Sequence, residues 1–469
     1  MIILGTNSIK DTGFDVANSC RFNAGSSDYL TRTPSGTGNR RTWTFSAWVK
    51  RTNPGAGNQI FQQSQNGSNY MKLYFSSDKI FWRGVSGGSN SAYIATNRLF
   101  RDVSAWYHIV ARFDSTNGTA GDRMRLYVNG VEETSFSTDI NPSSNYDSFA
   151  NTTNPIDIGR DNVNNASYFN GYMTEVCMVD GQSLAPDQFG EFDEDTGIWK
   201  PIDVSGLTFG TNGFYLDFED SSALGNDVSG NNNDFANTNF AATDQSTDTC
   251  TLNYNVMNPL DNFYSAATFS EGNIKVSSAR YAGVTSTFAL TKGKWYFEYK
   301  CVSRSGTSGF VGITSATATA TNYEFGNQSG ENVGYSVSLH NGSVYGNGGQ
   351  VAASGTFESI NGGDFGMVAL DFDNNKMYFG RNGTWGNSQN PANGTNALSI
   401  VAVTQGASGH WRIYVGGETN NATVFEMNFG SPPYAISSGN TDGDGYGNFE
   451  YEVPNSYFSL NSKNLAEYG

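Results

Sequence analysis

The chain has 469 residues, enough for two or three domains with cores of their own. Its 27 lysines and arginines against 44 aspartates and glutamates give a formal net charge of −17, which argues against a nucleic acid as partner, because phosphate binding needs clustered basic residues. Only 15% of the residues are charged and 14% are aromatic, so the composition is that of a folded protein with aromatic cores rather than of a disordered one.

The start of the chain and its cysteines bear on where the protein is made. The opening MIILGTNSIKDTG (1–13) is apolar only briefly and has no basic region, which predicts synthesis in a cytoplasm without a signal peptide. No run of about 18 apolar residues occurs, so no membrane insertion is expected. The cysteines at 20, 177, 250 and 301 lack metal-ligand spacing. Cys20 and Cys177 point to opposite faces of their predicted strands, so we expect reduced thiols.

Residues 1–195 predict a first domain of short strands. Apolar and polar residues alternate with a period of two, and Asn-Gly or Ser-Asp pairs stand at the turns. The predicted strand and hairpin segments are RTWTFSAWVKR (41–51), KLYFSSDKIFWRG (72–84), SAWYHIVARFD (104–114), MRLYVNGVEETSF (124–136), NPIDIGR (154–160) and FNGYMTEVCMVDG (169–181). One short helix is expected over 184–192, with Pro186 in its first turn.

Residues 196–250 predict a linker. The stretch DFEDSSALGNDVSGNNNDF (217–235) is dense in Asp, Asn, Ser and Gly, which favour turns over a core. Carboxylate and amide oxygens are also the ligands that Ca²⁺ prefers, but the spacing of an EF-hand is absent and the same residues dominate ordinary turns. The candidate calcium ligands are Asp217, Asp220, Asp227 and Asp234. A second calcium candidate is TDGDGYGN (441–448), and otherwise we expect no cofactor.

Residues 251–435 predict a second β domain. Its clearest hairpin is GDFGMVALDFDNNKMYFGRNG (363–383), which alternates, turns at Asn374-Asn375, alternates again and stops at Asn-Gly. Further strands are expected in KGKWYFEYK (292–300), GFVGI (309–313), VGYSVSLHNGSVYGNG (333–348) and VFEMNFGSPPY (424–434). Residues 436–469 predict a tail. Its end, YFSLNSKNLAEYG (457–469), is partly apolar without a core of its own, so we expect it to pack on the second domain or on a neighbouring subunit.

These patterns predict an all-β chain with two β-sandwich domains in tandem. In the first segment, Ala-Trp-Val, Trp-Tyr-His-Ile, Leu-Tyr-Val-Asn-Gly, Asn-Gly-x-x-x-Glu-Val and Leu-x-Pro-x-Gln-Phe follow one another, and this order resembles the concanavalin A-like, laminin-G-type jelly rolls. In the second, Trp-Tyr-Phe-Glu, Gly-Asp-x-x-Gly-x-x-x-Asp-x-Asp and Asn-Phe-Gly resemble the SPRY (B30.2-type) domain. That resemblance implies a bent sandwich that binds proteins through loops at one end.

The succession of the two domains resembles structural proteins of tailed phages, often marine ones. The segments that carry this resemblance are SCRFNAGSSDYLTRTPSGTGNRRTWTFSAWVKR (19–51), SSALGNDVSGNNNDF (221–235) and LNSKNL (460–465). It implies a virion protein that contacts other virion proteins. A homo-oligomer is expected, because closed symmetry is the default for repeated contacts. In similar proteins an LNSKNL-like stretch leads into a further domain, so we expect a shortened version here.

No pattern of catalytic residues stands out. The three histidines, which lack partners at ligand spacing, are His108, His340 and His410. GVSGG (84–88) fits G-x-S-x-G, but a Gly/Ser loop follows where that motif needs a helix. Acids alternate in FGEFDEDTG (189–197), as the paired carboxylates of glycosidases do, but they follow the closing strand and are typical of a solvated turn. These acids are Glu191, Asp193 and Asp195. We therefore expect no enzyme activity.

Aromatic residues at strand ends and in loops are the candidates for ligand contact. A ring on a rigid turn stacks on a sugar or fills a protein pocket at low entropic cost, although such a ring can also cover the edge of its own core. The candidates are Trp82, Tyr93, Tyr345 and Trp385. The expected function is recognition of a host-surface glycan or protein by a tail fibre or another exposed appendage. The alternatives are a capsid-decorating or head-fibre protein and, disfavoured by the missing acid pair, a carbohydrate-active hydrolase.

Overall fold

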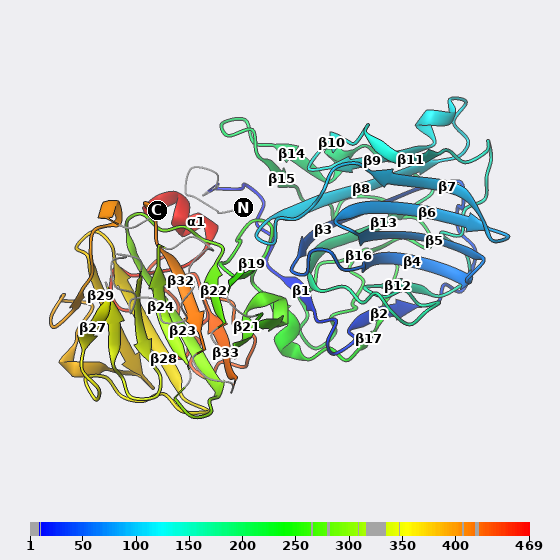
Figure 1. Ribbon diagram of the computed structural model, residues 1–469. Coiled ribbons are helices and arrows are strands. Elements are labelled where there is room, and N and C mark those ends of the chain that lie inside the picture. Colours follow the sequence, from blue (N-terminus) through cyan, green and yellow to red (C-terminus); the bar gives the residue numbers. More distant parts are fainter. Residues whose placement is uncertain are drawn as a thin grey trace. The chain divides into compact units, whose positions relative to one another are not determined.

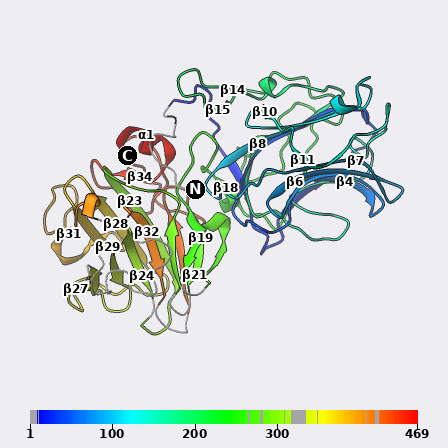
Figure 2. The ribbon, with the colours of Figure 1, turned by 45° about the horizontal axis from the view of Figure 1, so that its top comes forward.

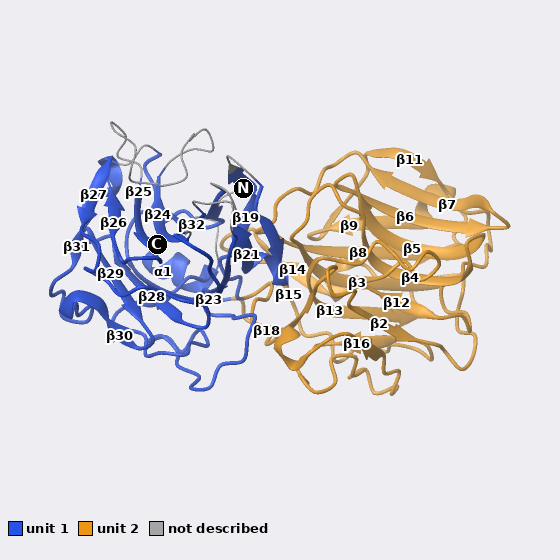
Figure 3. Ribbon diagram, turned by 60° about the horizontal axis from the view of Figure 1, so that its bottom comes forward, with its two compact units in different colours: residues 1–11, 252–469 blue, residues 12–251 orange. Residues whose placement is uncertain are grey.

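The computed structural model describes residues 9, 11–263, 266–278, 282–307, 309–315, 334–346, 348–405, 408–417 and 422–469. Most of the N-terminal stretch behind the expectation of no signal peptide lies outside these residues, as do residues 333 and 347 of the segment 333–348. The chain divides into two compact units, one of residues 12–251 and one of residues 252–469 with 1–11 (Figure 3). Within the described ranges, no helix has both the length and the hydropathy of a membrane span.

Unit 12–251 consists of two eight-stranded sheets that share one core. The first sheet has the order β10-β9-β8-β3-β13-β1-β18, with β16 beside β13. Its strands are β1 (Ser19–Phe22), β3 (Thr42–Arg51), β8 (Trp106–Asp114), β9 (Met124–Val128), β10 (Val131–Glu132), β13 (Gly171–Asp180), β16 (Phe214–Leu216) and β18 (Gln245–Ser246).

The second sheet has the order β11-β7-β6-β5-β4-β12-β2-β17, which can be followed from top to bottom in Figure 1. Its strands are β2 (Tyr29–Arg32), β4 (Asn58–Asn66), β5 (Asn69–Ser76), β6 (Lys79–Ser86), β7 (Ser89–Thr96), β11 (Phe136–Ile140), β12 (Ile156–Ile158) and β17 (Ala236–Thr238). Inward residues of both sheets meet in the core, where Trp43 of β3 stacks on Phe113 of β8 with 5.1 Å between the ring centroids.

The interval 196–250 is not a linker in the structure but part of the first sandwich. It supplies β16, β17 and β18, which pair with β13, β2 and β1. Apolar residues spaced among its turns enter the core, and these are Phe214, Leu216, Phe218, Leu224 and Phe235. The turn-rich composition concealed them, because Asp and Asn side chains bind backbone groups around each buried ring. The boundary between the units lies at 251/252.

The outer face of the first sheet is covered by the chain that follows β13. Cys177 and Tyr215 pack there with Phe189 and Phe209. The helix expected over 184–192 is wrong in extent, because only Pro186–Gln188 (η3) form a 3₁₀ turn. The next residues form β14 (Gly190–Phe192), which pairs with β15 (Trp199–Pro201), and this pairing is incompatible with a continuing helix.

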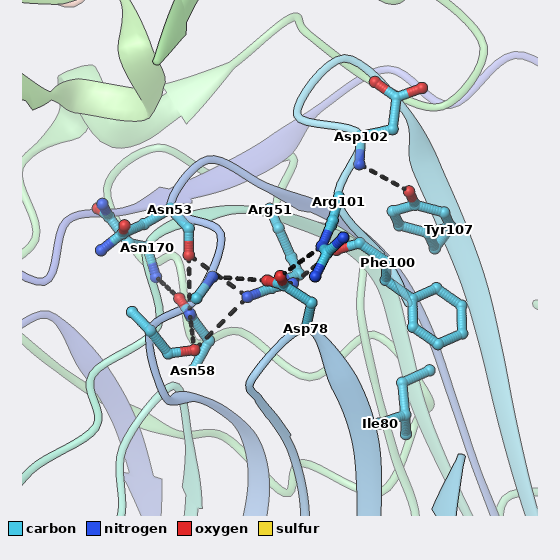
Figure 4. Close-up of polar contacts among 12 residues, drawn as sticks. Arg51, Asn53, Asn58, Asp78, Ile80, Phe100, Arg101, Asp102, Tyr107 and Asn170 are labelled. Carbon is cyan, nitrogen blue, oxygen red and sulfur yellow. Dashed lines mark hydrogen bonds and ion pairs between the residues drawn. The ribbon is translucent and has the colours of Figure 1, made fainter. Parts of the chain in front are cut away.

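Arg51 and Asp78 hold together the loops at one end of this unit (Figure 4). Asp78 lies between two arginines, with its Oδ1 3.3 Å from Arg51 Nη1 and its Oδ2 2.9 Å from Arg101 Nε. Arg51 also donates to the backbone oxygen of Phe100 at 2.6 Å. Burial alone would raise the pKa of the Asp78 carboxyl, but the Gly55 N–H and the two arginines together lower it below its usual value. Asp78 is therefore charged and fixes three loops at once.

Unit 252–469 is a second sandwich of two sheets. The seven-stranded sheet has the order β19-β22-β32-β24-β25-β26-β27. Its strands are β19 (Met257–Phe263), β22 (Gly283–Ser286), β24 (Phe310–Thr314), β25 (Gly334–Ser338), β26 (Val344–Gly346), β27 (Gly349–Ala352) and β32 (Arg412–Gly416).

The nine-stranded sheet has the order β20-β21-β33-β23-β28-β29-β30, with β31 beside β29 and β34 beside β23. Its strands are β20 (Thr268–Ser270), β21 (Lys275–Ser278), β23 (Lys294–Ser303), β28 (Phe365–Asp371), β29 (Lys376–Arg381), β30 (Thr384–Trp385), β31 (Leu398–Ser399), β33 (Thr423–Asn428) and β34 (Phe458–Ser459). The β28–β29 turn spans 372–375 and so is longer than the two-residue turn expected, with φ of 55° at Asn375 alone. The prediction of an all-β chain with two sandwiches in tandem is confirmed.

Residues 436–469, predicted as a tail, are folded onto the second unit. The strand β34 pairs in parallel with β23, and the helix α1 (Ser462–Tyr468) lies next to them (Figure 2). The Asn461 side chain caps this helix by accepting the N–H of Asn464 at 2.9 Å. Leu460 and Leu465 are buried in the core. The expectation that 457–469 pack on the second domain is therefore confirmed.

A buried glutamate in the nine-stranded sheet anchors this segment. Glu298 of β23 accepts the backbone N–H of Tyr451 at 2.8 Å and that of Glu450 at 3.0 Å. Tyr296 on the same strand donates its hydroxyl to Glu298 Oε1 at 2.8 Å. Burial raises the pKa of Glu298 although these hydrogen bonds oppose the shift. The outer face of the sheet is thereby closed by the segment 449–457.

Candidate functional site

The structure separates the four aromatic candidates. Trp82 of β6 is 1% exposed and meets Trp43 edge to face at 5.6 Å inside the core, so the expectation of ligand contact is not met for this residue. Tyr345 of β26 is half-buried and packs edge to face on Phe310 at 6.1 Å. Trp385 of β30 is half-buried and packs on Tyr296 at 6.4 Å.

Tyr93 of β7 lies on the outer face of the second sheet of unit 12–251, in a row that crosses all eight strands. From β17 to β11 the paired residues of this row are Ala236, Thr31, Asp157, Gln62, Lys72, Arg83, Tyr93 and Ile140. Directly paired residues project from the same face of a sheet, and neighbours such as Leu73 and Ile94 fill the core on the other side. We call this row, with the adjoining Tyr70, Tyr74 and Phe81, the cross-strand face.

Three half-buried rings form a continuous stack on the cross-strand face. Phe81 stacks on Tyr74 with 5.2 Å between the ring centroids and on Tyr93 with 6.2 Å. Burial raises the pKa of Tyr74 to about 12, so its hydroxyl is a neutral hydrogen-bond donor at any physiological pH. Ile140, 39% exposed, extends the apolar surface beyond Tyr93.

Two cations lie between these rings. Lys72 Nζ is 4.7 Å from the ring centroid of Tyr74, and the Arg83 guanidinium is 5.4 Å from that of Tyr93, both within the range of a cation–π contact. Lys72 also pairs with Asp161 at 3.3 Å. Burial alone would raise the pKa of the Asp161 carboxyl, but Lys72 and hydrogen bonds from Asn164 lower it. Arg83 has no carboxylate partner among the residues that the structure describes, and it donates to Asn90 Oδ1 at 2.6 Å.

Buried acceptors without a donor lie at the β12 and β4 end of this face. Asp157 is fully buried, and its Oδ2 accepts from Arg160 Nη2 at 2.9 Å while its Oδ1 has no hydrogen-bond partner. Gln62, the paired residue on β4, donates to Asn162 Oδ1 at 3.0 Å, and its Oε1 has no partner either. Unsatisfied buried acceptors are uncommon in folded proteins.

Of the residues of the cross-strand face, the sequence predicts ligand contact only for Tyr93, and that remains a prediction. The signal for the others was an aromatic–cation alternation, with Tyr70, Lys72 and Tyr74 on one strand and Phe81 and Arg83 on the next. These residues become one surface only through the strand register, which the sequence does not reveal without knowledge of the turns.

The four aspartates proposed as calcium ligands do not form a ligand set. Asp227 is buried, and its two carboxylate oxygens accept the N–H of Tyr215 at 2.8 Å and that of Asn233 at 2.8 Å. Asp234 accepts the N–H of Asp227 at 2.9 Å, and Asp217 and Asp220 cap turns of their own. No group of three His, Cys, Asp or Glu suited to a metal occurs in the described part of the chain.

The acidic stretch 441–448 is organised in the same way. Asp442 Oδ1 accepts the N–H of Asp444 at 3.0 Å and that of Tyr446 at 2.9 Å. Its Oδ2 accepts the hydroxyl of Ser459 at 2.7 Å and the amide of Asn464 at 2.8 Å. One oxygen therefore organises the turn 442–446 and the other holds Ser459 and Asn464, and we propose no calcium site here.

His108 of β8 is buried between two indoles and is not a general base. Its ring centroid is 4.7 Å from that of Trp48 and 5.9 Å from that of Trp199. Trp199 Nε1–H donates to His108 Nδ1 at 3.0 Å, which places the ring proton on Nε2, 2.8 Å from Ser46 Oγ. A base for Ser46 would need a lone pair there. Burial lowers the pKa of His108 to about 3 and keeps the ring neutral.

The other catalytic candidates have the partners of ordinary turns and surface ion pairs. Glu191 and Asp193, on the β14–β15 hairpin, face Lys200 Nζ at 3.4 and 3.3 Å. Asp193 also accepts the N–H of Thr196 at 2.9 Å, as in an ordinary turn. Ser86 of GVSGG ends β6 at a hairpin with positive φ at both following glycines, and no helix begins there.

Residues 24–187 match the concanavalin A-like lectin/glucanases superfamily (Laminin_G_3). Unit 12–251 therefore contains a concanavalin A-like, laminin-G-like domain. The name of this superfamily covers both lectins and glucanases. No curated protein matches the chain.

Among solved structures, the SPRY domain of human HERC1 is similar over 36% of this chain and 96% of its own, with 13% identity and a TM-score of 0.28. Mouse laminin α1 domains LG4-5 are similar over 91% of this chain and 92% of their own, with 11% identity and a TM-score of 0.31. A Bacteroides ovatus protein described as carbohydrate-binding is similar over 48% of this chain and 59% of its own, with 18% identity and a TM-score of 0.34.

Proposed function

We propose that the chain is a non-enzymatic binding protein whose cross-strand face recognises a surface saccharide. The observation that carries this proposal is the row of paired residues that places a stack of three rings beside Lys72 and Arg83. Rings supply apolar contact to the C–H faces and edges of a sugar, and cationic and hydroxyl groups between them supply hydrogen bonds.

Arg83 refines the class of ligand. Its guanidinium has no carboxylate partner among the described residues, although the whole chain carries a formal net charge of −17. A guanidinium pairs with a carboxylate in a bidentate geometry that a neutral hydroxyl does not offer. An acidic saccharide, with carboxylate groups, therefore fits this face better than a neutral one.

A tailed-phage virion is the proposed setting. The support is the sequence resemblance of the segments 19–51, 221–235 and 460–465 together with the succession of two sandwiches. A tail fibre or another exposed appendage, assembled as a homo-oligomer with other virion proteins, brings a binding face to a host-surface glycan or protein. A capsid-decorating or head-fibre protein is the alternative placement. Immunogold labelling of intact particles with an antibody against the chain distinguishes tail from head.

The binding proposal is tested on an array of bacterial surface polysaccharides that has acidic and neutral members. We expect the purified chain to bind acidic members, and we expect Tyr93→Ala to weaken binding about tenfold, since the variant removes a ring contact and a cation–π contact. Arg83→Gln should weaken binding to acidic members more than to neutral ones. Tyr345→Ala, a half-buried tyrosine in the other unit, is the matched control. Undiminished binding by Tyr93→Ala would contradict the proposal.

A further inference from the structure

A groove of about 480 Å³ lies on unit 252–469, away from the residues of the cross-strand face. One wall is the segment 451–455, and the other is formed by β30 and the loop 389–392. The volume is within the range of about 300–1,000 Å³ that is usual for small-molecule sites. The groove forms only because the segment 436–469 folds onto the sandwich, since this segment supplies one of its walls.

Two aromatic rings line the groove in fixed positions. Tyr451 lies against Gly383, where an added Cβ would come within 2.9 Å of the tyrosine ring, and it meets Phe365 edge to face at 5.8 Å. Its backbone N–H is held by Glu298 at 2.8 Å. Trp385, from β30, is half-buried. Rings held in this way bind a ligand without losing rotamer freedom.

Two prolines make part of the remaining lining apolar, and polar side chains lie at its rim. Pro391 and Pro454 are buried, whereas Asn390, Glu452 and Asn455 are exposed and available for hydrogen bonds. The indole N–H of Trp385 has no hydrogen-bond partner among the described residues. Glu452 is the one charged residue of the lining, and its charge is negative.

We propose that this groove is a second saccharide-binding site, specific for neutral sugars. Aromatic and proline surfaces accept the apolar face of a sugar ring, and amide side chains donate to and accept from neighbouring hydroxyl groups. The Glu452 carboxylate accepts hydroxyl protons and disfavours an acidic ligand by charge repulsion. The site is independent of the cross-strand face, because none of its residues comes from unit 12–251.

The test uses the full chain and a panel of soluble neutral oligosaccharides built of glucose, galactose, mannose or N-acetylglucosamine. Saturation-transfer NMR reports binding. Ala392 is exposed in the lining, so Ala392→Arg obstructs the groove without removing a packed side chain. Ala353→Arg, at an exposed alanine elsewhere on the same unit, is the matched control. We expect at least one oligosaccharide to bind the wild type and the control, and its affinity to fall at least tenfold in Ala392→Arg.

Further variants keep the result decisive. Asn455→Ala should weaken binding of the same oligosaccharide severalfold, since an exposed residue is removed without effect on the core. Tyr93→Ala should leave this binding unchanged. The proposal is overturned if no neutral oligosaccharide binds, if Ala392→Arg binds as well as Ala353→Arg, or if binding depends on Tyr93 alone. If acidic polysaccharides fail to bind the cross-strand face, the result for the groove is unaffected. The two proposals are therefore tested independently.

Discussion

Glu175 is buried in a strand with a backbone conformation that is rare for its type. Its φ is +51°, at the bulge where β13 changes register against β3 between Thr174 and Cys177. Tyr215 donates its hydroxyl to Glu175 Oε2 at 2.7 Å. Burial raises the pKa of Glu175 to about 8, so the carboxyl is largely protonated in neutral solution. At neutral pH this carboxyl therefore holds a proton in the folded state and loses it in the unfolded chain.

This proton makes stability depend on pH. Because the pKa is raised above the ordinary value of 4.5, the stabilisation is fully present below that value and is lost as the pH rises to about 8. Glu175→Gln keeps a neutral side chain at every pH. We expect the variant to gain stability relative to wild type between pH 5 and pH 8, by about 3–4 kcal/mol, with little further gain above. Urea unfolding at pH 5, 7 and 9 measures this difference.

The exposed Glu191 is the matched control for this experiment, and Glu191→Gln should run parallel to wild type across the same pH range. Parallel curves for Glu175→Gln as well would show that the carboxyl is not the source of the pH dependence.

The prediction that the chain does not hydrolyse polysaccharide depends on Glu191 and Asp193. We expect the purified chain to release no reducing sugar from the polysaccharides of the array, because Glu191 and Asp193 face Lys200 rather than a second acid across a substrate. The double variant Glu191→Gln, Asp193→Asn should bind as wild type does in the array experiment. Reducing sugar that appears with wild type and disappears with the double variant would establish a glycosidase.

Single residues also show where sequence reasoning stops. Ile80, Phe81 and Trp82 are three consecutive apolar residues, so a period of two does not say which of the two faces is inward. The structure turns Ile80 and Trp82 inward and Phe81 outward. The sequence alone does not show whether Trp82 lies in the core or on the surface, because this depends on which face of its strand the opposite sheet covers.

At the scale of elements, hairpins were predictable and irregular segments were not. The Asn-Gly turns at 129–130 and 382–383 take the positive φ that their residues favour. The two-residue strand β34 and the seven-residue α1 are too short for a periodic signal. Both are held by Asp442, which accepts the hydroxyl of Ser459 in β34 and the side-chain amide of Asn464 in α1.

Removing the end of this segment tests how much it contributes. Deletion of 457–469 removes core residues, including Leu460 and Leu465, that are 0% and 1% exposed. At about 1.5–3 kcal/mol for each large buried side chain, we expect a loss of several kcal/mol and a lower melting temperature of unit 252–469. Differential scanning calorimetry measures it, and sedimentation detects any change of oligomer mass.

A point variant separates packing from chain length in this test. Leu460→Ala should destabilise the same unit by about 2–5 kcal/mol without shortening the chain. If the truncated protein keeps its melting temperature and its sedimentation behaviour, the segment contributes nothing to the fold.

At the scale of the molecule, the two units have separate cores and should fold independently. We expect residues 12–251 and 252–469, expressed separately, to give cooperative unfolding transitions. A fragment ending at 195, the boundary that composition suggested, should fail to fold, because it lacks the five core residues between 214 and 235. At about 1.5–3 kcal/mol for each side chain, their burial contributes about 8–15 kcal/mol, which is as large as the net stability of about 5–15 kcal/mol of a typical domain. A soluble, cooperative 12–195 fragment would contradict the described boundary.

The two-domain, all-β organisation was predictable because both halves repeat the same strand and turn signals. The position of the boundary was not, since the alternation of Phe214, Leu216 and Phe218 covers only five residues, and the other two buried residues, Leu224 and Phe235, stand alone among Asp, Asn and Gly.

The pairing of β1 with β18 limits how fast unit 12–251 can form during synthesis. Ser19 donates its hydroxyl to the backbone oxygen of Asp248 across 229 residues of chain. At roughly 5–20 residues per second, a ribosome makes β1 on the order of ten seconds or more before β18 exists. Contacts of such sequence separation also form slowly after synthesis. β1 has only four residues and contains Arg21, so it is a poor template for aggregation while its edge is still unpaired.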